Sequence, residues 1–520
     1  MPSSSDSAIT SALVHFLSTA ALFRFFRFLH QVPALQLVPL PITSELAPRA
    51  LLSLPPNPAP PPTTSLLPSR QKHTPSCQSI SYINTSPLTV LSASKSYIHS
   101  YTPSTVTVYL DTRNNVSSAG HGNPAIADAV HQQMLLQNSN SRYLHSSFNE
   151  LKEQIAARLG GADDDGRGPW KIILTNAGSE SNDVALRIAR AHLQHKRSCK
   201  TFTTYTYSMS YHGHSTSCLS VSPYKLRKLG HHDSSLYCPP DTQVVWLPTP
   251  CPSSTPSPST AFDAAYTPSP STLMFECGMS VAGVVLPPAS YLSSAVSKIR
   301  SDGGLAIYDE VQSCCYRTGE FTCFQTMGYP SPDIVTLGKP LGNGFPLSAC
   351  CVRADVLESF ENEGLEYFNT FGGNAAACAA GLATLSELDR LRPVSDTTGA
   401  LLLGLLRDLH NKHPRMICDV RGRGMFLGVE FLNVRAPSDP SPEGTLELSF
   451  VASRLKDFHH VLTTIDGAKD SVMVIKPPLC FSPQDAAYFA DCLDKAITEC
   501  LRDVDENGAM GVLGCGATST

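Results

Sequence analysis

The chain has 520 residues, of which 42% are apolar and 16% charged, so it is long enough for two or three domains with a large buried core. Its formal net charge of −5 argues against a general nucleic-acid binder, because no basic field would collect phosphates along a duplex. The 17 cysteines include no Cys-x-x-Cys pair, and the histidine pairs lack partners at zinc-site spacing. We therefore expect neither a disulfide scaffold nor a metal site.

The N-terminal segment, residues 1–69, differs from the rest of the chain. Its stretch "SALVHFLSTAALFRFFRFLHQ" places Arg24 and Arg27 among apolar residues without an acid, a pattern typical of mitochondrial transit peptides. A disordered extension explains the pattern equally well. Residues 33–68 are proline-rich and read as a linker. The sequence contains no run of 18 or more apolar residues, so we expect no membrane span. We expect the protein to be mitochondrial or cytoplasmic.

The segment that follows has the pattern of an α/β protein. Short apolar strands such as "KIILT", "LAIYDE" and "DIVTLGK" are separated by stretches with helical periodicity, including residues 179–196, 374–388 and 399–412. Strands separated by helices predict a mostly parallel sheet covered on both faces, with ligands bound beyond the carboxyl ends of its strands. Residues 248–272 are rich in Pro, Ser and Thr and read as a surface insertion.

The first of these strands ends in "NAGSES", which opens directly into a predicted helix. A small glycine turn at a helix N-terminus presents free N–H groups and the positive end of the helix dipole, which suits a phosphate. Gly178 allows an anion to approach closely, and Ser179 can add a hydroxyl. An ordinary helix N-cap would explain the same residues.

Two further strands end in ionisable residues. Asp309 follows "LAIY", and Lys339 follows "DIVTLG" after about one crossover of a parallel sheet. Both side chains can therefore face one crevice, where they serve either chemistry or an ordinary ion pair.

An aromatic residue and a second glycine turn complete the set. Tyr211 and His212 follow the strand-like "TFTTYTYS", and an aromatic ring there can stack on a flat cofactor. Thr370 precedes a glycine pair and another helix, which makes it a second possible anion contact. One lysine, one acid, one aromatic ring and two phosphate-type turns are the residues that pyridoxal 5′-phosphate requires.

Six motifs resemble, in order and spacing, those of the class-III pyridoxal-phosphate aminotransferases. They are "NAGSESND", "YHGH", "DEVQ", "DIVTLGKPLGNGFP", "NTFGG" and "DVRGRGMFLGVEF", and the resemblance covers about residues 70–505. It implies an α/β protein of fold type I, with a mostly parallel seven-stranded sheet, a smaller α+β domain from both chain ends, and an obligate homodimer with sites at the interface. The expected division is an extension (1–69), an N-terminal part of the small domain (70–115), a large domain (116–390), a C-terminal small domain (391–505) and a tail (506–520).

The resemblance also assigns roles to residues. Lys339 would form the Schiff base with the cofactor, and Asp309 would hold the protonated pyridine nitrogen, so these two are the expected catalytic residues. The other implied cofactor contacts are Gln312 at the 3′-oxygen, Tyr211 and His212 at the ring, Gly178 and Ser179 at the phosphate, and Thr370 reaching the phosphate from the neighbouring subunit.

The branch of the family is indicated by further stretches, "NNVSSAGHGNP", "SNSRYLH", "SPYKLRK" and "VIKPPLCFS", which look like the phospho-lyases that act on ethanolamine phosphate or phosphohydroxylysine. Many class-III transaminases clamp the substrate carboxylate with an arginine where this chain has Val474, and a bidentate arginine pair is strong and specific. A substrate without that carboxylate needs no clamp. Arg142, Lys225 and Arg227 are candidates for its phosphate, although each is equally explained as a solvated charge.

Two departures from the family pattern and two alternatives remain. Cys314, Cys315 and Tyr316 replace small or phenyl residues, and their bulk would narrow the pocket or shift the interface. Asn123 replaces a usual histidine. The alternative functions are a transaminase of the alanine–glyoxylate or ω-amino acid type, and a catalytically inactive binding protein with the same fold.

Overall fold

The computed structural model describes residues 63–78, 87–102, 105–160, 168–251, 255–434 and 444–507. The proposed transit peptide lies outside these residues, as does most of the proline-rich linker. None of the described helices combines the length and apolarity needed to cross a bilayer.

The centre of the large domain is a seven-stranded sheet with the strand order β4-β10-β9-β8-β7-β5-β6. Every pairing is parallel except the two made by β10, so the predicted mostly parallel sheet is confirmed. Its inner strands β7, β8 and β9 are buried along their whole length, which explains their continuous apolar sequences. The strand bounds are β4 (Trp170–Thr175), β10 (Ser348–Arg353), β9 (Ile334–Leu337), β8 (Leu305–Asp309), β7 (Thr272–Glu276), β5 (Phe202–Tyr207) and β6 (Thr242–Leu247).

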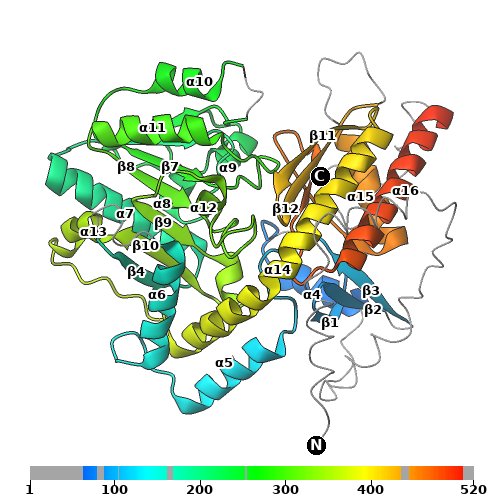
Figure 1. The fold of residues 1–520 in the computed structure, drawn as a ribbon, viewed down its shortest axis with the longest axis horizontal. Coiled ribbons are helices and arrows are strands. Elements are labelled where there is room, and N and C mark those ends of the chain that lie inside the picture. Colours follow the sequence, from blue (N-terminus) through cyan, green and yellow to red (C-terminus); the bar gives the residue numbers. More distant parts are fainter. Residues whose placement is uncertain are drawn as a thin grey trace, which may run out of the picture. The chain divides into compact units, whose positions relative to one another are not determined.

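Helices cover both faces of this sheet (Figure 1). On one face, α7 (Gly178–Arg197) and α13 (Ala354–Glu361) bury apolar residues against β7 to β10. On the other, α6 (Ser146–Leu159), α11 (Ala289–Ser301) and the start of α14 (Ala375–Lys412) join a larger core. The other helices between β3 and α14 are α5 (Pro124–Leu136), α8 (Thr216–Ser220), α9 (Pro223–Lys228), α10 (Pro258–Ala265), α12 (Cys323–Met327) and the 3₁₀ turn η1 (Lys339–Gly342).

Both ends of the described chain build the smaller domain. One sheet has the order β1-β2-β3-β13, in which the late strand β13 pairs with β3, and the other is β11-β12-β15-β14. This agrees with the expected small domain from both chain ends. The bounds are α4 (Thr63–His73), β1 (Val90–Ser94), β2 (Tyr97–Thr102), β3 (Thr105–Asp111), β11 (Ile417–Arg423), β12 (Phe426–Phe431), α15 (Thr445–His459), β13 (Val461–Leu462), β14 (Thr464–Asp466), β15 (Val472–Ile475) and α16 (Pro483–Asn507).

Helix α14 corrects the expected pair of helices at 374–388 and 399–412, because the two are one continuous helix of 38 residues. Pro393 lies inside it on the exposed side, as does the preceding Asp389. The hydrogen bond that a proline removes therefore leaves a carbonyl near solvent, and the buried residues on the opposite side keep the helix together. The expected boundary between residues 390 and 391 falls within this helix.

The low-complexity stretch at 248–272 is also more ordered than a surface insertion requires. Helix α10 lies within it, and its Phe262 is only 2% exposed and stacks on Tyr266 with 5.1 Å between ring centroids. This part of the stretch contributes to the core.

Candidate active site

A pocket of about 350 Å³ lies where strands β7, β8 and β9 end. Seven of the eight predicted cofactor residues line it, namely Gly178, Ser179, Tyr211, His212, Asp309, Gln312 and Lys339. The carboxyl ends of parallel strands meet at one edge of a sheet, and this topology brings together residues that are far apart in sequence.

Lys339 follows β9 and begins the turn η1, where its backbone has a φ of 27°, in the left-handed region. Such a conformation costs free energy for a residue other than glycine and is common at functional sites. Burial lowers the pKa of the Lys339 amine, whereas the carboxylates of Asp309 and Glu276 oppose that change. A lowered pKa favours the neutral amine, which is the form that attacks carbonyls and accepts protons.

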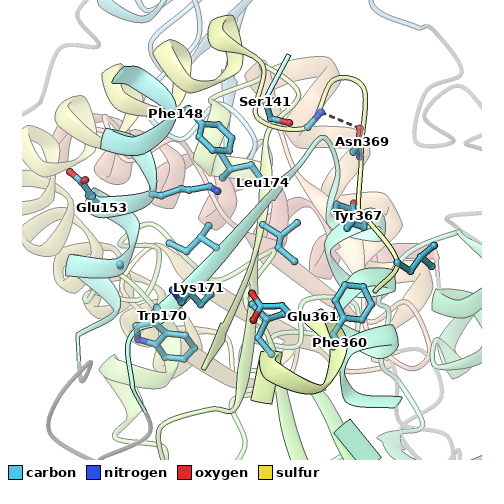
Figure 2. A pocket seen from close by; sticks show the side chains of 17 residues that line it. Ser141, Phe148, Glu153, Trp170, Lys171, Leu174, Phe360, Glu361, Tyr367 and Asn369 are labelled. Carbon is cyan, nitrogen blue, oxygen red and sulfur yellow. Dashed lines mark hydrogen bonds between the residues drawn. The ribbon is translucent and has the colours of Figure 1, made fainter. Parts of the chain in front are cut away.

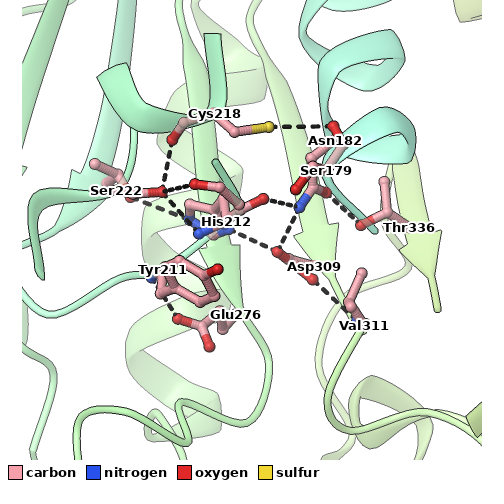
Figure 3. A network of polar contacts seen from close by, with 12 residues as sticks. Ser179, Asn182, Tyr211, His212, Cys218, Ser222, Glu276, Asp309, Val311 and Thr336 are labelled. Carbon is pink, nitrogen blue, oxygen red and sulfur yellow. Dashed lines mark hydrogen bonds and ion pairs between the residues drawn. The ribbon is translucent and has the colours of Figure 1, made fainter. Parts of the chain in front are cut away.

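Asp309 is 4% exposed and is surrounded by hydrogen-bond donors (Figure 3). His212 Nδ1 lies 2.7 Å from its Oδ2, Asn182 Nδ2 donates to the same oxygen at 2.8 Å, and Val311 N donates to Oδ1 at 2.9 Å. Donors of this kind stabilise the charged carboxylate without solvent. The pocket therefore contains a buried anion that can hold a protonated ring nitrogen.

Asn182 was not predicted as a site residue, although it lies within the quoted motif "NAGSESND". Its amide donates to Asp309 and to the carbonyl of His212 at 2.8 Å, while Thr336 Oγ1 donates to its Oδ1 at 2.6 Å. Asn182 is 1% exposed, and it joins α7 to the ends of β8 and β9. Its place one helical turn after the glycine turn was the available signal.

Glu276 was also missed, although it ends β7 in the same way that Asp309 ends β8. The two are register partners in adjacent parallel strands. Glu276 is 2% exposed, its Oε1 accepts the backbone N–H of Tyr211 at 2.8 Å, and its Oε2 has no hydrogen-bond partner among the described residues. Burial and the neighbouring Asp309 raise the pKa of Glu276 well above 4.5. Glu276 is therefore a buried carboxyl group in the pocket wall whose surroundings favour its protonated form.

The predicted phosphate turn is the N-terminus of α7. Its N-cap, Ala177, offers no side chain to the first N–H groups, which leaves them for an anion. A Cβ on Gly178 would lie 2.7 Å from Val311 Cγ1, so only glycine fits there. Ser179 Oγ accepts a hydrogen bond from the backbone of His214 at 3.2 Å, which turns the hydroxyl toward the 211–214 loop.

The remaining predicted residues are divided. Lys225 lies beside the pocket, with Nζ 5.5 Å from the ring centroid of Tyr211, whereas Arg227 is exposed. Arg142 is paired with Glu366 at 3.0 Å and lies outside the pocket of its own chain. Thr370 is likewise exposed and lies outside that pocket.

The departures from the family pattern have structural explanations. Asn123 caps α5, accepting hydrogen bonds from the first turn through its side chain. Cys314 and Cys315 are fully buried, and Tyr316 donates to Asp389 on α14. None of the three bulky residues lines the pocket, so the expected narrowing is not observed.

A model of the aminotransferase class-III family matches residues 107–497, so the chain belongs to this family. An ethanolamine-phosphate phospho-lyase homolog 1 of Caenorhabditis elegans is 31% identical over 422 residues, 75% of this chain and 85% of that protein. An Arabidopsis thaliana relative named alanine–glyoxylate aminotransferase 2 homolog 2, mitochondrial, is 29% identical over 75% of this chain and 79% of that protein. The structure of a phospholyase from Arthrobacter in complex with phosphoethanolamine has a TM-score of 0.72 at 30% identity, covering 83% of this chain and 99% of that one.

The chain is therefore an enzyme that depends on pyridoxal phosphate, and the pocket fits that cofactor. The N-terminus of α7 can bind the cofactor phosphate, and the pocket contains the amine of Lys339. The buried carboxylate of Asp309 can contact the ring nitrogen. Because Gly178 has no side chain, a phosphate can approach the backbone closely at this position.

Proposed function

We propose that this enzyme is a phospho-lyase that eliminates phosphate from a phosphorylated amine, either ethanolamine phosphate or 5-phosphohydroxylysine. The observation that carries the proposal is Val474. It is fully buried and packs in an apolar cluster with Val284, Phe426 and Val472, at the position where a carboxylate-clamping arginine is expected in transaminases. The relatives named phospho-lyase support the same branch.

Each pocket residue then has a role. When bound, pyridoxal phosphate links to amines and withdraws electrons from the neighbouring carbon. Lys339 removes the proton from the carbon that bears the substrate amine, and its lowered pKa suits it to act as a base. Asp309 keeps the ring nitrogen protonated. The electrons released at that carbon expel phosphate from the next one, and water completes the products: an aldehyde, ammonia and phosphate.

The deciding experiment incubates the purified, cofactor-loaded enzyme with ethanolamine phosphate and no keto acid. We expect phosphate and acetaldehyde to appear in equal amounts. Parallel incubation with 5-phosphohydroxylysine decides between the two substrates. If neither compound releases phosphate, the lyase proposal is wrong.

The second candidate function is a class-III transaminase, favoured by the relative named alanine–glyoxylate aminotransferase. Product formation from alanine and glyoxylate, with no phosphate release from either phosphorylated amine, would support it. An inactive protein would bind the cofactor and yet turn over none of these compounds.

We also propose that the protein is a homodimer, as fold type I implies. A second pocket, of about 550 Å³, lies along the edge strand β4, between α6 and the segment 357–372 (Figure 2). Exposed edge strands are usually covered in native proteins. Large apolar side chains are exposed on nearby segments, including Leu135, Leu136, Tyr143, Leu144, Leu365, Phe368 and Phe371. In such a dimer Arg142 and Thr370 would approach the partner's pocket. Light scattering coupled to size exclusion tests this, and a monomer would contradict it.

For localisation, we propose mitochondrial import directed by residues 1–65, supported by their composition and by the mitochondrial Arabidopsis relative. Fusion of these residues to a fluorescent protein tests the proposal, and diffuse cytoplasmic fluorescence would argue for the alternative location.

A further inference from the structure

Asn115 connects the small domain to a side chain of the active-site pocket. It lies in the segment that follows strand β3, and it is 5% exposed. Its Nδ2 donates a hydrogen bond to Oε1 of Gln312, which is 197 residues away in the chain. Gln312 lines the pocket, whereas Asn115 does not. Any effect of Asn115 on a ligand in the pocket is therefore exerted through Gln312.

The backbone on both sides of Asn115 is held by buried side chains. Asp111 Oδ1 accepts the backbone N–H groups of Arg113 and Asn114 at 3.0 and 3.1 Å. Ser118 Oγ donates to the backbone carbonyl of Asn115 at 2.9 Å. Asp111 and Ser118 are fully buried, so water does not compete for these contacts. The position of Asn115 is therefore fixed by the fold of its own segment.

The contact with Asn115 decides which end of the Gln312 amide is available to a ligand. A side-chain amide carries an acceptor oxygen at one end and an NH₂ donor group at the other. Asn115 occupies the oxygen, and Gln312 Nε2 has no hydrogen-bond partner among the described residues. Gln312 therefore offers a donor in the pocket. Hydrogen bonds to charged groups are stronger than those to neutral ones, so this donor favours an ionised oxygen over a hydroxyl.

The polar groups of pyridoxal phosphate indicate which oxygen this is. The N-terminus of α7 suits the phosphate, Lys339 suits the carbonyl, and Asp309 suits the ring nitrogen. The oxygen at the 3′ position is the polar group that these residues leave without a partner. Gln312 supplies the matching donor, in agreement with the role that the resemblance implies for it.

We propose that Asn115 is a positioning residue, which holds the Gln312 amide with its N–H donor toward the 3′-oxygen of the cofactor and so keeps that oxygen ionised. The inference goes beyond the proposed function, because a lyase and a transaminase use the same cofactor. Asn115 was not among the predicted site residues, since its role depends on a contact between distant parts of the chain.

The test uses the holoenzyme without substrate. Asn115→Asp replaces the donor with a carboxylate, which accepts from Gln312 Nε2 and turns the amide oxygen toward the cofactor. We expect the absorbance of the bound cofactor to report ionisation at a pH about one unit or more above that of the wild type, because a hydrogen bond to a charged oxygen is lost. Cofactor affinity should fall at least about tenfold. Asn115→Ala should shift the titration less in the same direction, and it decides the question if Asn115→Asp does not fold.

The matched control is Asn114→Asp, the same change one residue earlier. Asn114 Oδ1 accepts the backbone N–H of Val116 at 3.1 Å, and a carboxylate can keep that contact. This control should titrate as the wild type does. The other titratable groups that line the pocket are the same in every variant, namely Tyr211, His212, Glu276, Asp309 and Lys339.

A double variant tests whether Asn115 acts through Gln312. In a Gln312→Ala background, Asn115→Asp should add little further shift, because the amide that it positions is gone. A wild-type titration in both Asn115 variants would overturn the inference. An equal shift from Asn114→Asp, or an equal shift from Asn115→Asp with and without Gln312, would overturn it as well. Because no substrate is used, a failure of the lyase proposal leaves this result unaffected.

Discussion

His212 and Asp309 form a buried pair at the end of strand β8, with His212 Nδ1 2.7 Å from Asp309 Oδ2 and each residue less than 5% exposed. Asn182 donates to the same carboxylate oxygen. The position of this carboxylate is therefore fixed by contacts from α7 and from the 211–214 loop before any ligand binds. Preorganised charge of this kind is a large contribution to enzyme catalysis.

The first prediction concerns Asn182. Alanine at this position removes a donor to Asp309 and leaves Thr336 Oγ1 without its acceptor. Unsatisfied buried groups cost about 1–3 kcal/mol, so we expect kcat/KM to fall at least about tenfold and cofactor affinity to weaken. Steady-state kinetics and cofactor titration measure both. Retention of wild-type cofactor affinity would mean that Asn182 does not position the carboxylate.

The second prediction concerns Lys339. Lys339→Ala should abolish turnover and shift the absorbance of the bound cofactor, because the amine that links to it is gone. Lys339→Arg keeps a cation but has no comparable nucleophile, so it should be equally inactive. Turnover by either variant would exclude Lys339 as the catalytic base.

The sequence identified the residues expected to carry out the chemistry, but it did not identify all the residues that form the pocket wall. Asp309 and Lys339 were found because each ends an apolar strand. Glu276 also ends an apolar strand. Its place in the pocket, however, follows from its register with Asp309, and that register is known only from the pairing of β7 with β8 in the structure.

The error at α14 has a different origin. The sequence pattern predicts two helices with Pro393 between them, whereas Pro393 lies on the exposed side of one helix whose buried residues continue past it. Tertiary packing outweighs the local cost of a proline in that position. Exposure of one residue cannot be read from its own sequence neighbourhood.

The third prediction concerns the glycine turn. Gly178→Ala places a methyl group 2.7 Å from Val311 Cγ1, where something must move at the start of α7. We expect this variant to bind the cofactor more weakly, with a smaller effect on the stability of the folded protein. Gly404→Ala is the control, since its added Cβ meets nothing within 4 Å and alanine favours the helix. Equal cofactor affinity in the two variants would argue against a close approach of the cofactor phosphate to the backbone at Gly178.

The fourth prediction uses the raised pKa of Glu276. Because the folded pKa exceeds 4.5, the contribution of Glu276 to stability is full below that value and is lost as the pH rises through the folded pKa. Glu276→Gln keeps the acceptor for Tyr211 N but cannot ionise. The melting temperature of this variant should therefore gain on that of the wild type as the pH rises above 4.5. A constant difference across that range would mean that Glu276 titrates normally.

The fifth prediction concerns the stability contribution of Lys476, a buried lysine that follows β15 and donates to Ser280 Oγ at 2.8 Å. Its folded pKa of about 8 lies below the ordinary 10.5, so its contribution to stability is full above 10.5 and is lost as the pH falls through about 8. Near pH 7, Lys476→Met should therefore remove up to about 3 kcal/mol of the free-energy cost of keeping this ammonium group buried in the folded protein. About 1 kcal/mol is lost again because Ser280 loses its partner.

We therefore expect Lys476→Met to melt at a higher temperature than the wild type near pH 7, with a smaller advantage near pH 10. A variant that melts at a lower temperature than the wild type at both pH values would mean that Lys476 stabilises the fold.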